Sequence, residues 1–384
     1  MTHEIFFNNR LVYGTGALDR LGILCAGLGS RALLVTGRSS LKSSGVLDRI
    51  FRSLGDASIE YAQFDDIGAN PSVSMVDRCS ELGRKTGAGL VVAVGGGSAM
   101  DTAKAAAAMM TNSGSVEKYL EAGSSPAPLS SAPVPMIAIP TTAGTGTEVT
   151  QNAVINIPGR GLKVSIRSPM LVPCLAILDP SLLASCPGEV VAAAGMDALT
   201  QLIEPLTGRN SQPVVDSLCI DGIIRINRSL LKFYYDRNDL EAGLDLQIAA
   251  YYSGLALANA GLGGVHALAR PFGGMFGLPH GLVCAILLPH ISSLNWRANI
   301  PQYARAGHAL GADAACPEEE AAGYCVTRIA ELNAALSVPP DFKNFNIGRE
   351  HIDKIVEDGQ GGSLKNNPAA LTVPQLKSLL ERLL

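Results

Sequence analysis

The sequence lacks three features whose absence excludes whole classes of protein. Its longest apolar runs, at residues 134–139 and 283–288, are far shorter than the roughly 20 residues needed to cross a bilayer, so we expect no membrane anchor. No block of Lys or Arg is long enough to bind a phosphate backbone, and the net charge is −4, so nucleic acid is not an expected partner. The N-terminus has neither the basic region nor the apolar core of a signal peptide. These absences favour a small-molecule ligand.

Cysteine spacing indicates the redox compartment of the protein, and composition indicates how many domains it forms. The eight cysteines form no C-x-x-C pair and no disulfide framework, and a chain of 384 residues does not need such cross-links. We therefore expect reduced thiols and a cytoplasmic location. With 47% hydrophobic residues, 17% charged residues and 41 glycines, the chain should form a compact, loop-rich structure of two domains.

Two patterns of apolar residues divide the chain. In the first half, short β-branched runs are each followed by a helix-like pattern, as in parallel βα units, at residues 31–36, 89–94, 134–139 and 175–178. Residues 1–7 look like an additional first strand. After residue 185, apolar residues recur at helical spacing over residues 190–206, 216–233, 240–260, 318–335 and 373–384. The sequence therefore predicts an α/β N-terminal nucleotide-binding domain with a parallel, Rossmann-like sheet at residues 1–184, and an all-α C-terminal domain at residues 185–384.

A glycine-rich turn at residues 95–98 (GGGS) is the first candidate for binding a phosphate. It follows an apolar run and precedes a predicted helix, for which Ser98 is a suitable N-cap, with Asp101 at capping-box spacing. Glycines let the backbone approach a pyrophosphate, and a helix N-terminus supplies N–H groups and a partial positive charge. The alternative is a tight βα turn without a ligand. The usual G-x-G-x-x-G fingerprint is absent from the first βα turn, where residues 36–40 read TGRSS.

A second polar loop at residues 140–148 (PTTAGTGTE) strengthens the nucleotide hypothesis. It interleaves hydroxyl and carboxylate side chains with two glycines, which is more polar than a connection between core elements requires. Hydroxyls and exposed backbone amides suit a ribose or a phosphate. A purely structural role for the loop is the alternative.

A carboxylate and two histidines form the candidate metal site. The chain has six histidines, and His266 and His280 share one glycine-rich segment. Asp197 lies on a predicted apolar helix, with Gln201 and Glu204 on the same face. One Asp and two His leave an open position on a divalent cation, which polarises a carbonyl or stabilises an alkoxide. Alternatively, Asp197 caps a helix and the histidines form hydrogen bonds in the core.

These motifs together resemble those of the iron-containing (group III) alcohol dehydrogenases, relatives of glycerol dehydrogenase and dehydroquinate synthase. The resemblance runs nearly end to end, through Asn70-Pro71, GGGSAMDTAK, PTTAGTGTE, the Lys163 segment, Asp179-Pro180, GMDALT and PHG. It implies an oxidoreductase that transfers a hydride between NAD(P)H and a small aldehyde, ketone or oxo acid. It also implies a homodimer.

The resemblance further implies a role for each matching residue. Lys163 would take part in catalysis, and the metal would be bound by Asp197, His266 and His280. Arg270 and Gln201, which depart from the family pattern, are the other catalytic candidates. The positions expected to bind the cofactor are Gly37, Ser39, Ser40, Asn70, Gly96, Gly97, Ser98, Asp101, Thr141, Thr142, Thr147 and Lys163.

Two departures from the family pattern change the expected site. Gln201 stands where the family usually has a third metal histidine, and Arg270 stands where it has a histidine four residues after His266. Glycerol dehydrogenase and dehydroquinate synthase use one carboxylate and two histidines, so a three-ligand Fe²⁺ or Zn²⁺ site completed by Gln201 or water is chemically reasonable. Arg270 would bind an anionic substrate in bidentate fashion; alternatively it pairs with an acidic residue or a cofactor phosphate.

The choice of cofactor and the alternative functions remain to be considered. No carboxylate follows the first strand at residues 37–40, so the sequence favours NADP(H) over NAD(H). One alternative is a metal-free NADP(H)-dependent carbonyl reductase in which Arg270 and Gln201 polarise the substrate. Others are a nucleotide-binding homologue without catalysis and a lyase similar to dehydroquinate synthase.

Overall fold

The computed structural model describes residues 4–7, 9–37, 41, 44–68, 70–122, 125–160 and 162–384. The chain divides into two compact units. One, the sheet unit, comprises residues 7–142 and 146–186. The other, the helical unit, comprises residues 187–384, residues 143–145 and the described part of Met1–Phe6. The short 143–145 segment groups with the helices because Gly144 lies so close to a helix that a Cβ there would be 2.9 Å from the Cα of Ala194.

The sheet unit is built on six parallel strands in the order β1-β8-β5-β4-β2-β3. Their bounds are Arg10–Tyr13 (β1), Leu175–Leu178 (β8), Met136–Pro140 (β5), Leu90–Gly95 (β4), Arg31–Thr36 (β2) and Glu60–Phe64 (β3). The four strands predicted from the β-branched runs are all present. The α/β fold with a parallel sheet is therefore confirmed.

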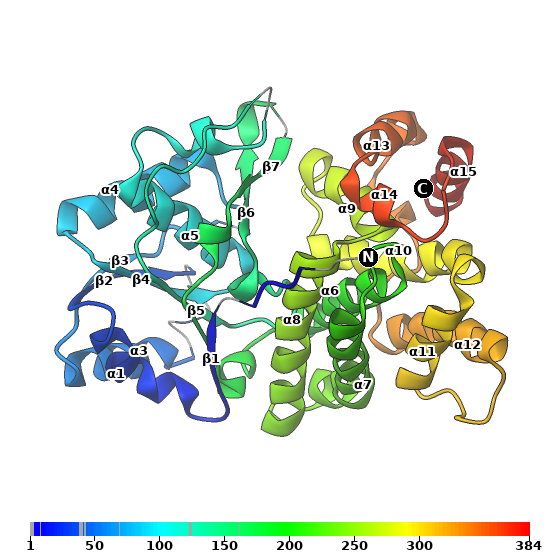
Figure 1. Ribbon diagram of the computed structural model, residues 1–384, viewed down its shortest axis with the longest axis horizontal. Helices are drawn as coiled ribbons and strands as arrows, with labels where there is room; N and C mark the ends of the chain where they lie inside the picture. The colour runs from blue at the N-terminus through cyan, green and yellow to red at the C-terminus, as the bar shows by residue number, and fades with distance from the viewer. Residues whose placement is uncertain are drawn as a thin grey trace. The chain divides into compact units, whose positions relative to one another are not determined.

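Helices cover both faces of this sheet, which explains why its central strands are apolar throughout. Leu34 and Val92 enter one core together with α1 (Leu21–Ala26) and α3 (Val46–Asp56). The alternate residues Leu33 and Val91 enter the other core, with α4 (Val73–Thr86) and α5 (Gly97–Thr111). The alternation follows from the two-residue period of a strand. Figure 1 shows these helices around the blue and cyan strands.

An antiparallel hairpin outside the main sheet was not predicted. It pairs β6 (Asn152–Ile157) with β7 (Leu162–Arg167), with Asn156 opposite Lys163. Alternate β6 residues are buried, and Ile155 packs in one cluster with Met109 of α5. The hairpin therefore fixes the position of Lys163 against the helix that follows the glycine turn.

The prediction of a strand at the N-terminus was wrong for its described residues. Residues 4–7 form no strand, and the first strand, β1, begins at Arg10. The backbone of Phe6 is instead paired with a side chain: its N–H donates to Asn259 Oδ1 at 2.6 Å, and Asn259 Nδ2 donates to its carbonyl oxygen at 3.2 Å. These bonds take the place of a ladder partner.

The helical unit contains all five predicted helices, so the all-α prediction for this part is confirmed. These are α6 (Gly188–Thr207), α7 (Pro213–Tyr235), α8 (Leu240–Ala260), α12 (Glu318–Ala335) and α15 (Val373–Leu383). Further helices complete the unit: α9 (Gly264–Met275), α10 (His280–Asn295), α11 (Ile300–Ala309), α13 (Ile352–Asp358) and α14 (Gly362–Asn366). Residues 195–207 of α6 are all buried, because α7, α8 and α10 pack around it (Figure 1).

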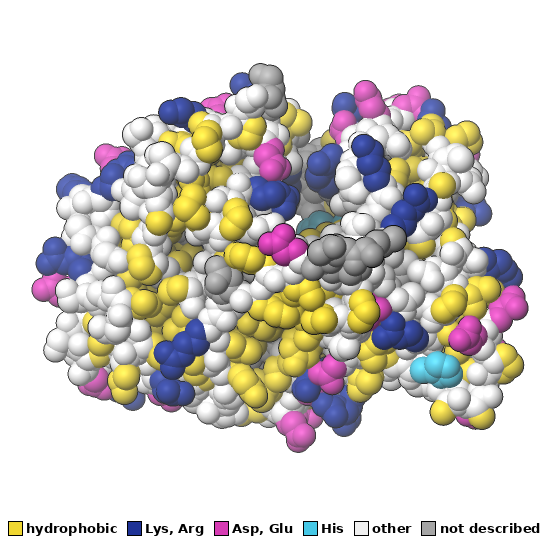
Figure 2. Space-filling model, viewed as in Figure 1, with side chains coloured by type: hydrophobic (Ala, Val, Ile, Leu, Met, Phe, Trp, Pro, Cys, Tyr) yellow, Lys and Arg dark blue, Asp and Glu magenta, His cyan; other side chains and the backbone are white. Residues whose placement is uncertain are grey.

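Helix length, surface charge and the state of the cysteines complete the description of the fold. Among the described residues, no helix is long and apolar enough to span a membrane. Figure 2 shows Lys and Arg side chains scattered over one face, with Asp and Glu side chains between them. All eight cysteines are free thiols.

Candidate functional site

Three helices of the helical unit bring four potential metal ligands together. Asp197 comes from α6, His266 from α9, and His280 and Cys284 from α10, and one ligand atom of each lies within 4.8 Å of the others. Asp197 Oδ1 is 3.4 Å from His266 Nε2 and 3.8 Å from His280 Nε2. The structure thus brings together the three residues predicted from sequence and adds one that was not predicted.

Asp197 carries an oxygen that the protein alone does not satisfy. The residue is 2% exposed, and its buried Oδ1 has no hydrogen-bond partner. Burial raises the pKa of Asp197, but the neighbouring His266 and His280 outweigh that effect and hold it below its usual value. A buried, ionised oxygen without a partner is costly, so its environment favours a cation beside it.

Glu204 orients one of the two imidazoles. Its Oε2 lies 2.7 Å from His266 Nδ1, and its Oε1 accepts the backbone N–H of Val265 at 2.7 Å. With Nδ1 engaged, the Nε2 atom of His266 faces Asp197 and the rest of the cluster. Sequence reasoning placed Glu204 on the correct helix face but did not assign it this contact.

Gln201 orients Asp197 instead of facing the cluster with its oxygen. Its Nε2 donates to Asp197 Oδ2 at 3.3 Å, while its Oε1 accepts from the Ser253 hydroxyl at 2.9 Å. Both ends of the amide are therefore engaged. Its predicted catalytic role stays a prediction.

Close packing between α10 and α6 sets the position of His280. Gly281 follows it in the first turn of α10, and a Cβ on Gly281 would lie 2.5 Å from the carbonyl oxygen of Ala193 and 3.3 Å from Asp197 Cβ. Only glycine permits this approach. The sequence motif PHG thus places the imidazole beside the carboxylate.

Sequence reasoning missed Cys284 because it treated the eight cysteines as one group. Its sulfur lies 3.6 Å from His280 Nε2 and 3.8 Å from His266 Nε2. The spacing could have indicated that Cys284 lies near the metal site, since it comes one helical turn after His280. Burial raises the pKa of the Cys284 thiol to about 12, so without a cation the group is protonated.

Arg270 is one turn after His266 on α9 and is exposed. One guanidinium nitrogen, Nη2, donates to the backbone carbonyl oxygen of Asp358 at 2.6 Å. This contact ties α9 to the end of α13. The predicted role of Arg270 in substrate binding or catalysis stays a prediction.

In the sheet unit, the helix after the glycine turn begins earlier than predicted. The N-cap of α5 is Gly96, not Ser98, and no side chain caps the helix. The reason is that the N–H groups of both Ala99 and Met100 bond to the carbonyl oxygen of Gly96, which places Ser98 inside the first turn. Gly96, Gly97 and Ser98 are half-buried. An uncapped, glycine-rich helix start fits an anionic ligand.

Several predicted cofactor residues lie at the carboxyl ends of neighbouring strands of the sheet. Gly37 comes directly after β2, the glycine turn follows β4, and Thr141 follows β5. These three strands are adjacent and parallel, so their carboxyl ends meet. Thr141 N–H donates to the Gly95 carbonyl oxygen at 3.0 Å, and the Thr142 side chain is 3.5 Å from the Cβ position of Gly96. Ser39 and Ser40 lie outside the described residues.

Asp101 and Thr147 form a contact that holds the threonine loop to α5. The Thr147 hydroxyl donates to Asp101 Oδ1 at 2.7 Å, and Val154 N–H donates to Asp101 Oδ2 at 3.0 Å. Gly146, with φ 59°, takes the left-handed conformation that allows the loop to turn into Thr147. Both carboxylate oxygens of Asp101 thus bind protein groups. Whether Asp101 and Thr147 also bind cofactor stays a prediction.

Lys104 is a buried cation in this region that the sequence reasoning did not select. It is 1% exposed, and Nζ contacts the Thr147 hydroxyl at 2.9 Å, the Thr150 carbonyl and hydroxyl oxygens at 2.9 Å each, and the Asn152 carbonyl oxygen at 3.0 Å. Burial lowers the pKa of Lys104 to about 8, although Asp101 and Glu148 oppose this shift. The sequence feature that could have indicated this buried cation is a lysine within an alanine-rich helix.

The remaining predicted cofactor residues are half-buried in the sheet unit. Lys163 on β7 lies near enough to Asp101 for that carboxylate to raise its pKa, although burial lowers it overall. Asn70 lies in the bend before α4, where the carbonyl oxygen of the adjacent Pro71 accepts the Asn156 N–H at 2.7 Å. Their contact with a cofactor stays a prediction.

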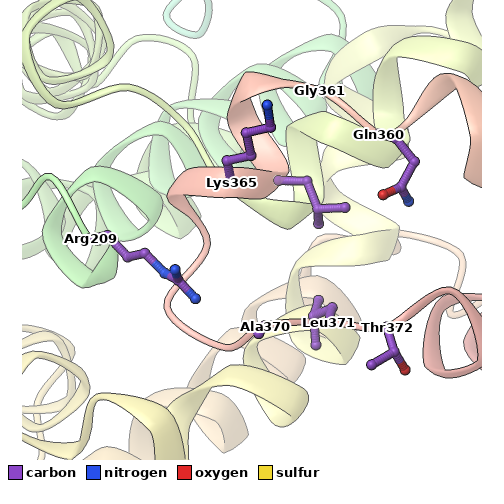
Figure 3. Close-up of a pocket in the computed structure, with 8 residues that line it drawn as sticks. Arg209, Gln360, Gly361, Lys365, Ala370, Leu371 and Thr372 are labelled. Carbon is purple, nitrogen blue, oxygen red and sulfur yellow. The ribbon is translucent and has the colours of Figure 1, made fainter.

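A surface pocket of about 400 Å³ in the helical unit involves none of these residues (Figure 3). Arg209 and Lys365 approach it from different segments, and Arg209 Nε donates to the Asn367 carbonyl oxygen at 3.0 Å. Its lining is Arg209, Gln360, Gly361, Leu364, Lys365, Ala370, Leu371 and Thr372. No residue predicted to have a chemical role lines it.

Comparison with known proteins agrees with this geometry. Residues 8–180 match the family model for iron-containing alcohol dehydrogenase, and residues 191–384 match that for the C-terminal region of the Fe-containing alcohol dehydrogenase family. The chain is 38% identical to choline dehydrogenase of Bacillus subtilis over 329 residues, 85% of this chain and 81% of that one. It is 31% identical to alcohol dehydrogenase 4 of Saccharomyces cerevisiae, over 96% of this chain and 95% of that one.

The crystal structure of a 1,3-propanediol oxidoreductase superimposes with a TM-score of 0.94 at 29% identity, covering 100% of both chains. Each of these relatives is by name a dehydrogenase or an oxidoreductase. The chain itself belongs to the iron-containing alcohol dehydrogenase family, so the resemblance predicted from sequence is confirmed. Membership supports an alcohol oxidoreductase, and the family implies NAD(H) and Fe²⁺.

Proposed function

We propose that the protein catalyses reversible hydride transfer between C4 of a nicotinamide cofactor and the carbonyl carbon of a small aldehyde, ketone or oxo acid. The observation that carries this proposal is the convergence of Asp197, His266 and His280 around a buried carboxylate oxygen without a hydrogen-bond partner. Family membership supports the reaction class.

The donor atoms fit a divalent cation. A carboxylate oxygen and two imidazole nitrogens are ligands that both Fe²⁺ and Zn²⁺ accept, and they leave room for a substrate oxygen. When bound, such a cation polarises the carbonyl and stabilises the alkoxide. Glu204 fixes the ring of His266. Gln201 holds Asp197 by Oδ2, whereas Oδ1 is the oxygen that lies 3.4 Å from His266 Nε2.

The sheet unit supplies the groups proposed to bind the nucleotide. The uncapped first turn of α5 at Gly96 and Gly97 would bind the pyrophosphate through its amides and partial positive charge. Thr141 and Thr142 would contact the nucleotide, and Lys163 would reach the nicotinamide ribose.

Proton transfer differs from a histidine-dependent scheme. Position 270 is an arginine and not the histidine that would relay a proton in such a scheme. We propose that water or a ribose hydroxyl would protonate the alkoxide on reduction and would accept the proton of the alcohol on oxidation.

The sequence after β2 and the name of one relative point to different cofactors. β2 ends at Thr36, and residues 37–40 contain no carboxylate to repel a 2′-phosphate, which supports NADP(H). A methanol dehydrogenase of Bacillus methanolicus, 28% identical, is NAD-dependent by name. Steady-state kcat/KM with each cofactor decides the point, and a strong preference for NADH would overturn the NADP(H) proposal.

Substrate charge is a separate question, centred on Arg270. A guanidinium would favour an aldehyde that carries a carboxylate or sulfonate. A structural neighbour at 28% identity is a sulfoacetaldehyde reductase, whereas the relative at 38% identity is named for choline, a cation. Arg270→Ala should raise KM for anionic aldehydes and leave neutral ones unchanged. Equal effects on both would remove the proposal of an anionic substrate.

The reaction itself is tested with anaerobically purified protein, loaded with Fe²⁺ or Zn²⁺, on a panel of primary alcohols, diols, choline and the matching aldehydes. Reduced nicotinamide is followed by absorbance. Asp197→Asn and His266→Ala should abolish turnover. His290→Ala is the control, because its Nε2 contacts the Pro340 carbonyl oxygen at 3.2 Å and it is not part of the cluster. Wild-type activity after chelation would favour the metal-free reductase, and tight cofactor binding without turnover would favour the non-catalytic homologue.

The assembly is inferred from the family resemblance, and the location from the scattered cysteines. We propose a homodimer and a cytoplasmic enzyme. Light scattering coupled to size-exclusion chromatography measures the first, and fractionation of cells measures the second.

A further inference from the structure

Cys284 occupies a position that the three-ligand site does not use. Its sulfur lies 3.6 Å from His280 Nε2 and 3.8 Å from His266 Nε2, the nitrogen atoms that also face Asp197 Oδ1. The side chain is fully buried. All four donor atoms fall within 4.8 Å of one another, close enough to share one ion.

The other polar groups beside the cluster are already engaged. Gln201 binds Asp197 through its nitrogen and Ser253 through its oxygen. Glu204 uses both of its oxygens, one on His266 and one on the Val265 N–H. A fourth protein donor must therefore come from elsewhere, and Cys284 has the required position.

The surroundings of Cys284 differ from those of the structural cysteines. A buried free cysteine usually behaves as a small apolar residue. Cys25 and Cys79 fit that description, because each packs within an apolar core of the sheet unit. The thiol of Cys284 instead faces two imidazoles and a carboxylate, which is a poor environment for an apolar group but a suitable one for a ligand.

We propose that Cys284 is the fourth protein ligand of the cation, and that this sulfur donor makes the site select Zn²⁺ over Fe²⁺. The inference rests on the proposed function, because it concerns the same cation site. Aspartate, histidine and cysteine are each zinc ligands, and thiolate is the softest of them. On binding, the S–H bond breaks, the metal–sulfur bond forms, and the proton leaves to solvent without any redox change. A cation held by these four residues would bind the substrate oxygen by expanding its coordination to five.

Cobalt substitution tests the inference without any activity measurement. Co²⁺ added to the metal-free protein should give both visible d–d bands and a near-ultraviolet thiolate-to-cobalt band. Cys284→Ser and Cys284→Ala should keep the d–d bands and lose the thiolate band. Cys316→Ser is the matched control, because Cys316 is half-buried in the turn before α12 and outside the cluster. A thiolate band that persists in both Cys284 variants would overturn the inference.

Competition between metals tests the selectivity. In equimolar Zn²⁺ and Fe²⁺ under anaerobic conditions, the wild-type chain should retain mostly zinc. Cys284→Ser should lower the bound Zn²⁺ to Fe²⁺ ratio by at least about 10-fold, the smallest effect typical of perturbing a metal site. An unchanged ratio would contradict the proposed selectivity.

The wild-type zinc protein provides a test that does not depend on a variant folding. X-ray absorption should detect one sulfur at about 2.3 Å in addition to nitrogen and oxygen ligands at about 2.0–2.1 Å. A shell of nitrogen and oxygen alone would overturn the sulfur ligand but leave the proposed function standing. Failure of the wild-type protein to retain Co²⁺, Zn²⁺ or Fe²⁺ would instead remove the cation site and the proposed function that uses it.

Discussion

Glu204 Oε2 lies 2.7 Å from His266 Nδ1, and this contact joins the central helix α6 to α9. It fixes which nitrogen of the imidazole is available to the cluster. An outer partner of this kind typically changes metal affinity by about 10- to 100-fold. We therefore expect Glu204→Gln to retain the fold but lower metal affinity by that factor, measured as metal per chain after dialysis. Glu189→Gln, an exposed change in the first turn of the same helix, should have no effect. Equal retention in both variants would contradict the positioning role.

Gly281 should tolerate no side chain. Alanine there would place Cβ 2.5 Å from the Ala193 carbonyl oxygen, forcing the first turn of α10 away from α6. We expect Gly281→Ala to lower the free energy of unfolding by about 1–3 kcal/mol and to reduce metal retention. Gly323→Ala is the control: it lies within α12, has no atom within 4 Å of the Cβ position, and should stabilise the helix by about 1 kcal/mol. Urea unfolding gives both values, and the same sign for the two variants would refute the packing argument.

Lys104 should be required for stability of the sheet unit. Replacing it by methionine leaves the acceptors on Thr147 and Thr150 without their donor and removes the cation near Asp101 and Glu148. Breaking a buried charged network in this way costs about 3–5 kcal/mol. Lys85→Met, an exposed change in the last turn of α4, should change the free energy of unfolding by less than about 0.5 kcal/mol. Similar values for the two variants in chemical denaturation would show that the network is unimportant.

Glu148 should give the free energy of unfolding a pH dependence. Burial raises the pKa of Glu148 from 4.5 to about 7 in the folded chain. Between these values Glu148 binds more protons in the folded than in the unfolded state, so its contribution to the free energy of unfolding decreases as pH rises and becomes constant above about pH 7. Lys104, with a pKa of about 8, stays largely charged across this range.

Glu148→Gln should remove this decrease, which is on the order of 3 kcal/mol for a shift from 4.5 to about 7. The measured quantity is the difference in free energy of unfolding between the variant and wild type at a series of pH values, so that titration of other groups cancels. A difference that stays constant from pH 4.5 to 7 would show that the carboxyl is not perturbed.

Local patterns predicted most of the fold. The β-branched runs gave β2, β4, β5 and β8, and helical periodicity gave α6, α7, α8, α12 and α15, because both signals depend only on neighbours in sequence. The wrong predictions depended on partners distant in the chain. The N-terminal strand failed because Asn259 binds the Phe6 backbone, and the β6–β7 hairpin was missed because its burial depends on α5.

By itself, the sequence determined the family, the glycine turn, the threonine loop and the candidate ligands Asp197, His266 and His280, since these are motifs of residue type and order. Only the tertiary structure decided which side chains complete those sites. Cys284 joins the cluster and Gln201 turns its amide to Asp197 because several helices pack closely. Lys104 enters a buried network because α5 packs against the threonine loop and β6. Such contacts arise from packing between segments far apart in the chain, which no local spacing specifies.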